Sequence, residues 1–105
     1  SATVTPHAGV PQSGATGAVV TGEMLHVGLL RYPRGSWSQP HSHPNEQFTF
    51  VVGGALRAEI GSEPFLVGKH CVVHVPAGMP HHLSAAGDAD ALVVTLQDSR
   101  CEFMG

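Results

Sequence analysis

The stretch PHSHPNEQF holds two histidines one residue apart, His41 and His43, followed by a glutamate and a glutamine. Side chains alternate between the two faces of an extended strand, so His41, His43 and Gln47 share one face. Two imidazoles at this spacing both reach one metal ion at about 2.0–2.2 Å, and Gln47 adds an amide oxygen. Pro44 leaves the last ligand open, because a one-residue bulge at a proline would turn Glu46 inward instead. Strand parity favours Gln47 over Glu46.

A second histidine pair, His81 and His82, follows the turn sequence PAGMP. A proline-glycine turn presents the next side chain at the start of a returning strand. Neighbouring residues on a strand point to opposite faces, so only one member of this pair faces inward. The sequence therefore contains two histidine clusters that can contribute to one metal site if the fold brings them together.

Short strands separated by Gly and Pro turns have to position these clusters. The 105 residues contain 13 Gly and 8 Pro, only 12% of them are charged, and no long segment has a helical apolar stripe. This pattern predicts one all-β domain, a sandwich or small barrel. Residues 1–17 are poor in large apolar side chains, and we expect them to form a flexible N-terminal arm before a β-barrel domain over residues 18–105. The strands that we expect are 23–32, 47–52, 55–60, 64–67, 71–75 and 91–96, with a hairpin turn at residues 53–54.

The two clusters resemble the two motifs of the cupin superfamily. The first motif is Gly, five residues, HxH, three or four residues, an acid, six residues and Gly, and it matches from Gly35 to Gly54. The second, PxG, two residues and His, matches from Pro76 to His81. The resemblance implies a double-stranded β-helix, the cupin jelly-roll barrel, with a metal inside its mouth and usually as a homodimer.

Carried over residue by residue, the resemblance assigns metal ligation to His41, His43 and His81. It puts Gln47 at the position where the family usually has a glutamate, and His70 where the second motif normally begins with glycine. The form with glutamine resembles small single-domain cupins that include proteins linearising unsaturated uronates from pectin and alginate.

Three imidazoles and an amide are neutral ligands, so a bound divalent metal keeps nearly its full charge and acts as a Lewis acid. We therefore expect a metal-dependent lyase or isomerase acting on a small sugar-derived or carbonyl-bearing acid, with one divalent transition metal per chain (Ni, Zn, Mn, Fe or Cu). One alternative is a dioxygenase that uses the same site; its common pattern of two histidines and a carboxylate would need Glu46. Another is a non-catalytic sensor or binding module for a small ligand.

Lewis-acid catalysis also needs a proton carrier and a way to hold the substrate. His74, two residues before Pro76, is a candidate base if its strand lines the barrel; the competing interpretation is a core or subunit-interface histidine. Arg31 is a candidate for binding a substrate carboxylate, and its competing interpretation is a structural ion pair.

The net charge, the hydrophobicity and the cysteine content exclude several classes of protein. A formal charge of −3 argues against a nucleic-acid partner, and no apolar run has the length of a membrane span. Cys71 and Cys101 do not form a CxxC pair, and no signal peptide is visible, so we expect a cytoplasmic protein with Cys71 buried in its strand. We also expect a homodimer, because small open barrels expose apolar sheet edges.

Overall fold

The structure, a computed structural model, describes residues 8–9, 14–36 and 39–103. This part of the chain consists of β-strands joined by turns and loops and contains no helix, hence none that could cross a membrane. The strands are β1 (Ala8–Gly9), β2 (Thr16–Thr21), β3 (Leu25–Tyr32), β4 (Gln47–Gly53), β5 (Leu56–Ile60), β6 (Glu63–Val67), β7 (Val72–Val75), β8 (His81–Ala85) and β9 (Ala91–Asp98).

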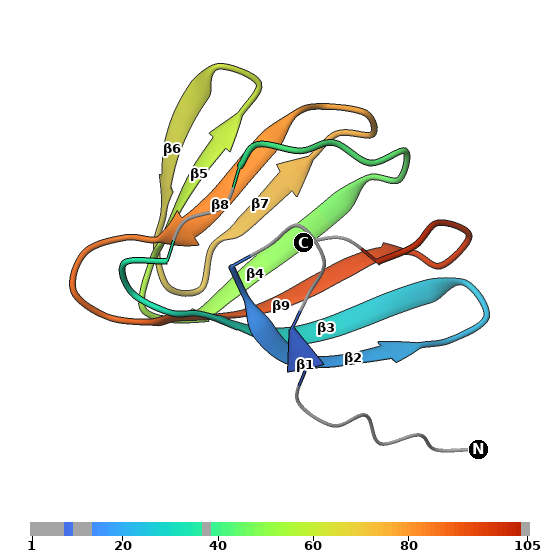
Figure 1. Ribbon diagram of the computed structural model, residues 1–105, viewed down its shortest axis with the longest axis horizontal. Helices are drawn as coiled ribbons and strands as arrows, with labels where there is room; N and C mark the ends of the chain where they lie inside the picture. Colours follow the sequence, from blue (N-terminus) through green and yellow to red (C-terminus); the bar gives the residue numbers. More distant parts are fainter. Residues whose placement is uncertain (1–7, 10–13, 37–38, 104–105) are drawn as a thin grey trace.

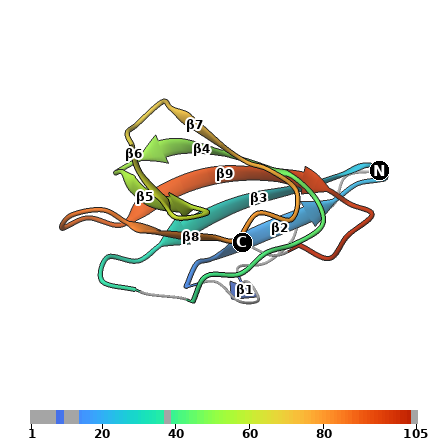
Figure 2. The same cartoon turned by 90° about the horizontal axis from the view of Figure 1, so that it is seen from above.

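The strands form two antiparallel sheets (Figures 1 and 2). The larger sheet has the order β1-β2-β3-β9-β4-β7, and the smaller has the order β6-β5-β8. An isolated bridge between His41 and His81 continues the smaller sheet past β8. The two sheets face each other as a β-sandwich, so the all-β fold expected from the sequence is confirmed.

The interior between the sheets has an apolar and a polar part. β3 buries every second side chain, as strand alternation requires. Along β4 and β9 the inward positions change from apolar residues to threonine and glutamine. The apolar core includes Leu30, Tyr32, Val51, Leu56 and Val93, each at most 1% exposed. The buried polar side chains on the two strands are Gln47, Thr49, Thr95 and Gln97, each at most 2% exposed.

Two details differ from the sequence-based expectations. Thr16 and Gly17, assigned to the N-terminal arm, are the first residues of β2 and pair with β3. Residues 1–7 and 10–13 of that arm lie outside the described residues, so its extent stays a prediction. Cys71 was expected to be buried, but it precedes β7 and is exposed.

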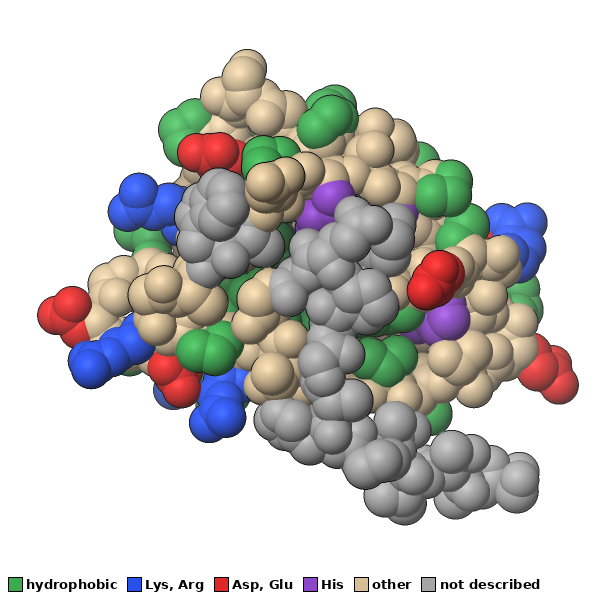
Figure 3. Space-filling model, in the orientation of Figure 1, with side chains coloured by type: hydrophobic (Ala, Val, Ile, Leu, Met, Phe, Trp, Pro, Cys, Tyr) green, Lys and Arg blue, Asp and Glu red, His purple; other side chains and the backbone are tan. Residues whose placement is uncertain are grey.

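Charged side chains lie mostly toward the two ends of the long axis in the view of Figure 3, with uncharged side chains between them. Apolar side chains are also exposed on the outer face of the larger sheet, among them Val27, Leu29, Phe48 and Leu92. Such a face is compatible with the expected homodimer, which stays a prediction because it concerns a second chain.

His70, at the position where the cupin motif normally has glycine, is the one described non-glycine residue with positive φ, at 72°. A side chain in this left-handed region costs about 1–2 kcal/mol. We expect His70→Gly to raise the free energy of unfolding by about 0.5–1 kcal/mol. This net gain is the backbone strain that glycine relieves minus the conformational entropy that glycine adds to the unfolded chain. Urea denaturation measures this change.

Lys69→Gly is the matched control, because Lys69 is adjacent and has no positive φ. It should lower the free energy of unfolding through the entropy term alone. Equal effects of the two substitutions would contradict the strain at His70.

Candidate metal centre

Three histidines from two distant parts of the chain meet inside the sandwich. His41 and His43 come from the segment before β4, and His81 is the first residue of β8. Their ligand atoms all lie within 4.8 Å of one another. The ring centroid of His81 is 4.5 Å from that of His41 and 4.7 Å from that of His43. This cluster can hold a metal ion.

Backbone carbonyls determine which ring nitrogen of each histidine faces the others. The Nδ1 atom of His43 lies 2.8 Å from the carbonyl oxygen of Asn45, and that of His81 lies 2.9 Å from the carbonyl oxygen of Met79. His41 Nδ1 approaches a carbonyl oxygen too, at 3.4 Å. A carbonyl oxygen only accepts, so each Nδ1 carries the proton and the Nε2 lone pairs are available to a metal.

Gln47, the first residue of β4, is fully buried beside the histidines. Its Oε1 atom lies 3.1 Å from His43 Nε2, and its Nε2 atom donates to Thr49 Oγ1 at 2.9 Å. The amide oxygen, which is a metal donor, therefore faces the cluster, and the amide nitrogen faces away from it.

A chain of buried amides fixes this orientation. Asn45 Nδ2 donates to the backbone carbonyl of Asp98 at 3.0 Å and lies 3.4 Å from Gln97 Oε1. Gln97 Nε2 in turn donates to Gln47 Oε1 at 2.9 Å. The backbone carbonyl can only accept, so every amide in the chain Asn45–Gln97–Gln47 has a defined direction. We call these three residues the amide relay.

His43 has an oxygen near each of its ring nitrogens, the Asn45 carbonyl at Nδ1 and Gln47 Oε1 at Nε2. A neutral imidazole donates one hydrogen bond only, so one of these contacts requires a proton or another cation between nitrogen and oxygen. When Nδ1 donates, His43 and Gln47 would hold that cation through Nε2 and Oε1. This donor arrangement fits a metal ion.

Glu46 and the two residues proposed for catalysis do not join the cluster. Burial alternates from His41 through Phe48, and Glu46 is exposed. Its Oε1 atom pairs with His74 Nε2 at 2.9 Å, and the His74 ring stacks on Phe48 on the outer face of the larger sheet. Arg31 is also exposed and lies 3.8 Å from a carboxylate oxygen of Asp90. His74 lies on the outward face of β7, because Val73 and Val75 take the inward positions, and its role as a base stays a prediction.

The outer end of the relay carries a strong ion pair. The Arg100 side chain donates from Nε to both carboxylate oxygens of Asp98, at 3.0 and 2.9 Å, and from one terminal nitrogen to Oδ2 at 2.6 Å. These bonds, together with one from the Arg100 backbone, lower the pKa of Asp98 to about 2, and the same pair raises the pKa of Arg100. Asp98, the last residue of β9, supplies the relay's anchoring carbonyl, and its lowered pKa keeps its carboxylate ionised to lower pH than in an ordinary aspartate.

The sequence analysis did not identify Gln97 or the two threonines that continue the polar chain. Thr49 Oγ1 lies 2.9 Å from Thr95 Oγ1, and both residues are fully buried. A signal was present: Thr95 and Gln97 are polar at the inward positions of an otherwise apolar strand. Buried polar side chains need hydrogen-bond partners, so this pair pointed to a polar interior next to the histidines.

Comparison with known proteins identifies the family. Residues 28–96 match the family model described as a cupin domain. The chain belongs to the cupin family. An uncharacterized protein of Streptomyces coelicolor is similar to this cupin, with 34% identity over 73 residues that make up 67% of this chain and 68% of the relative.

Solved structures resemble this cupin over most of its length. KdgF from Halomonas sp. matches with a TM-score of 0.74 and 26% identity, over 83% of this chain and 80% of that one. An RmlC-like cupin from Shewanella frigidimarina matches with a TM-score of 0.77 and 14% identity, over 90% of this chain and 84% of that one. The second likeness concerns the fold alone.

Proposed function

We propose that this cupin is a metal-dependent enzyme, a lyase or isomerase that acts on a small molecule carrying a carbonyl or hydroxyl group. One divalent transition metal would be bound by His41, His43, His81 and Gln47. The observation that carries the proposal is the grouping of three histidine ligand atoms within 4.8 Å of one another, with the Gln47 amide oxygen 3.1 Å from His43 Nε2.

The donor set decides the class of chemistry. All four donors are neutral, and among the described residues no carboxylate joins the histidine cluster. A metal in this set supplies Lewis acidity, which polarises a substrate oxygen. Backbone carbonyls hold the imidazoles in one tautomer, and the amide relay keeps the Gln47 amide oxygen pointed at them. The buried side chains of β4 and β9 lie beside them. This set argues against the two-histidine, one-carboxylate pattern of many oxygenases, because Glu46 points outward.

Elemental analysis of the purified protein tests the proposal first. We expect about one Ni, Zn, Mn, Fe or Cu per chain, reduced in Gln47→Ala. Oxygen uptake after addition of Fe(II) and a candidate substrate would favour the dioxygenase alternative. A protein that neither contains a metal nor takes one up would overturn the proposal and support the non-catalytic binding module.

The amide relay gives a second test. Removing the Gln97 amide by Gln97→Leu should free the Gln47 amide to rotate, and metal affinity should fall by about 10–100-fold, as is usual for groups that orient a metal ligand. Competition with a chromogenic chelator measures this affinity.

Thr95→Val is the matched control, since Thr95 is equally buried on β9 and its hydroxyl lies 2.9 Å from Thr49 Oγ1, outside the relay. Its metal affinity should change less than threefold, even if both variants lose stability. Equal losses of affinity would show that Gln97 acts through general packing and not by orienting Gln47.

A further inference from the structure

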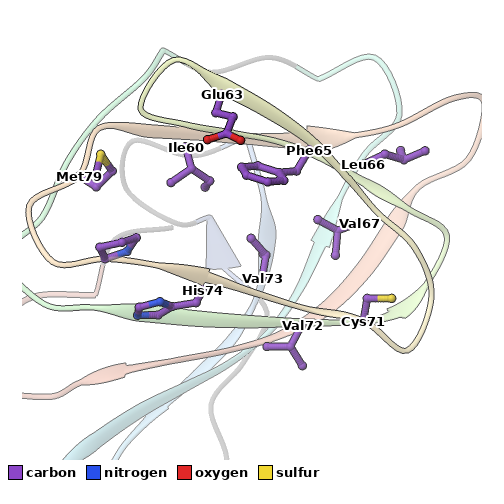
Figure 4. A pocket seen from close by; sticks show the side chains of 11 residues that line it. Ile60, Glu63, Phe65, Leu66, Val67, Cys71, Val72, Val73, His74 and Met79 are labelled. Carbon is purple, nitrogen blue, oxygen red and sulfur yellow. The ribbon is translucent and has the colours of Figure 1, made fainter.

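A cleft opens between the free edges of the two sheets, where β6 ends one sheet and β7 ends the other. Its volume is about 490 Å³, within the roughly 300–1,000 Å³ of small-molecule sites. Figure 4 shows its side chains, which are mostly apolar. Those used below are Ile60, Glu63, Phe65, Val73 and Met79.

Strand pairing shows that β6 contributes inward-facing side chains to this cleft. Residues paired across an antiparallel ladder point to the same face. Val67 pairs with the buried Leu56, so Phe65 and Glu63, two and four residues away, also face inward. Both are nevertheless exposed, because no strand covers them on this side. In Figure 4 the Glu63 carboxylate lies over the gap between Ile60 and Phe65.

The cleft and the histidine cluster occupy the same level of the barrel. Glu63 pairs with Ile60, Ile60 with His81, and His81 with His41, which makes one inward-facing row across the smaller sheet. Glu63 is thus two strand spacings from His81, about 10 Å between Cα atoms. Ile60, which lines the cleft beside Glu63, is thus the direct strand neighbour of His81.

Other walls of the cleft also adjoin metal-binding residues. Met79 lines the cleft, and its carbonyl oxygen holds His81 Nδ1. Val73, on the opposite sheet, lines the cleft and pairs with Thr49, which accepts the hydrogen bond of the Gln47 amide. The cleft therefore adjoins the candidate metal centre on both sheets, through Met79 on one side and Val73 on the other.

The charges in the cleft restrict what it can bind. No lysine or arginine is among the described residues that line it, and Glu63 is its single carboxylate. Within the described part of the chain, no cationic side chain lies within 4.0 Å of that carboxylate to form a salt bridge. His74 lines the outer rim and is paired with Glu46.

We propose that this cleft is the substrate pocket of the metal centre and that it takes a small, mostly apolar molecule. One end carries an oxygen donor for the metal, and the other presents a hydrogen-bond donor to Glu63. The inference rests on the proposed function and narrows it. It disfavours the sugar-derived acid expected from the sequence, because a carboxylate at the Glu63 end of this pocket would face Glu63 with no lysine or arginine lining the cleft beside it.

Hydroxamates of different shape test the pocket in protein loaded with Co(II), whose visible spectrum reports ligand binding. Benzohydroxamate should bind at least about 10-fold more tightly than acetohydroxamate, because its phenyl ring enters the apolar cleft. Ile60→Trp should remove this preference by filling the cleft, with acetohydroxamate affinity and metal content unchanged. Glu59→Trp is the matched control, since Glu59 is adjacent on β5 and faces outward.

Glu63 is tested by a second variant that leaves the cleft's shape intact. In the wild type, 4-carboxybenzohydroxamate should bind at least threefold more weakly than benzohydroxamate, through repulsion by Glu63. Glu63→Gln should abolish this difference, and Glu59→Gln should keep it. Equal affinities of the wild type for acetohydroxamate and benzohydroxamate would overturn the pocket, and a carboxylate penalty unchanged in Glu63→Gln would overturn the role of Glu63. Failure of the protein to take up Co(II) would instead overturn the proposed function, and this inference with it.

Discussion

His43→Ala is expected to abolish metal binding, with affinity lowered by more than about 100-fold. His43 is 3% exposed, it lies within ligand distance of both other histidines, and its Nε2 atom faces Gln47 Oε1. Loss of groups that only orient ligands costs about 10–100-fold, and loss of a ligand costs more. Elemental analysis and chelator competition measure the effect.

The same substitution should also remove the stabilisation that metal gives the fold. A ligand at 100 times its dissociation constant adds about 2.7 kcal/mol to the free energy of unfolding. Urea denaturation of the wild type with and without Zn(II) should show a shift of this size at that concentration. His43→Ala should show none.

Glu46→Ala is the matched control for His43→Ala. Glu46 belongs to the same segment but is exposed and contacts His74 on the outer face of the sheet. Its variant should keep the metal content and the metal-dependent shift in stability. Metal loss in Glu46→Ala together with retention in Gln47→Ala would contradict the ligand assignment.

The sequence predicted the local pattern of the site because alternation along an extended chain is a local property. His43 and Gln47 are buried and Glu46 is exposed, as parity required, although residues 44–45 form a bend and not a strand. The bend keeps the two-residue period, so the bulge considered at Pro44 does not exchange Glu46 for Gln47.

The same reasoning could not determine the direction of His74. Alternation along a strand shows which residues share a face. Which of the two faces points inward depends on the side against which the other sheet packs. β7 is the edge strand next to β4, and its residues Val73 and Val75 face the interior, so His74 lies outside with Phe48. Glu63 was missed for a related reason, because its row through Ile60 to His81 exists only once β5, β6 and β8 are paired.

Gly54→Ala should cause one of the largest losses of stability in the chain, about 3 kcal/mol or more. Gly54 lies between β4 and β5 and has a φ of 65°, which costs a residue with a side chain about 1–2 kcal/mol. An added Cβ atom would also lie 2.4 Å from the carbonyl oxygen of Asp90 and 3.2 Å from Ala91 Cα. Ala91 is fully buried at the start of β9, so the backbone cannot move away without disturbing the core. Urea denaturation, with the slope compared between variants, measures the loss.

Gly87→Ala separates the two causes. Gly87 has a similar φ of 75°, but an added Cβ atom would meet nothing within 4 Å. This variant should therefore lose only the conformational part, about 1 kcal/mol. If the loss of stability at Gly54 is no greater than at Gly87, the turn relaxes away from Asp90. Gly54, which closes the first cupin motif, is then required for its backbone conformation alone. A larger loss at Gly54 means that the motif needs glycine because β9 passes directly over the turn, which ties the metal-binding segment to the strand that carries Gln97.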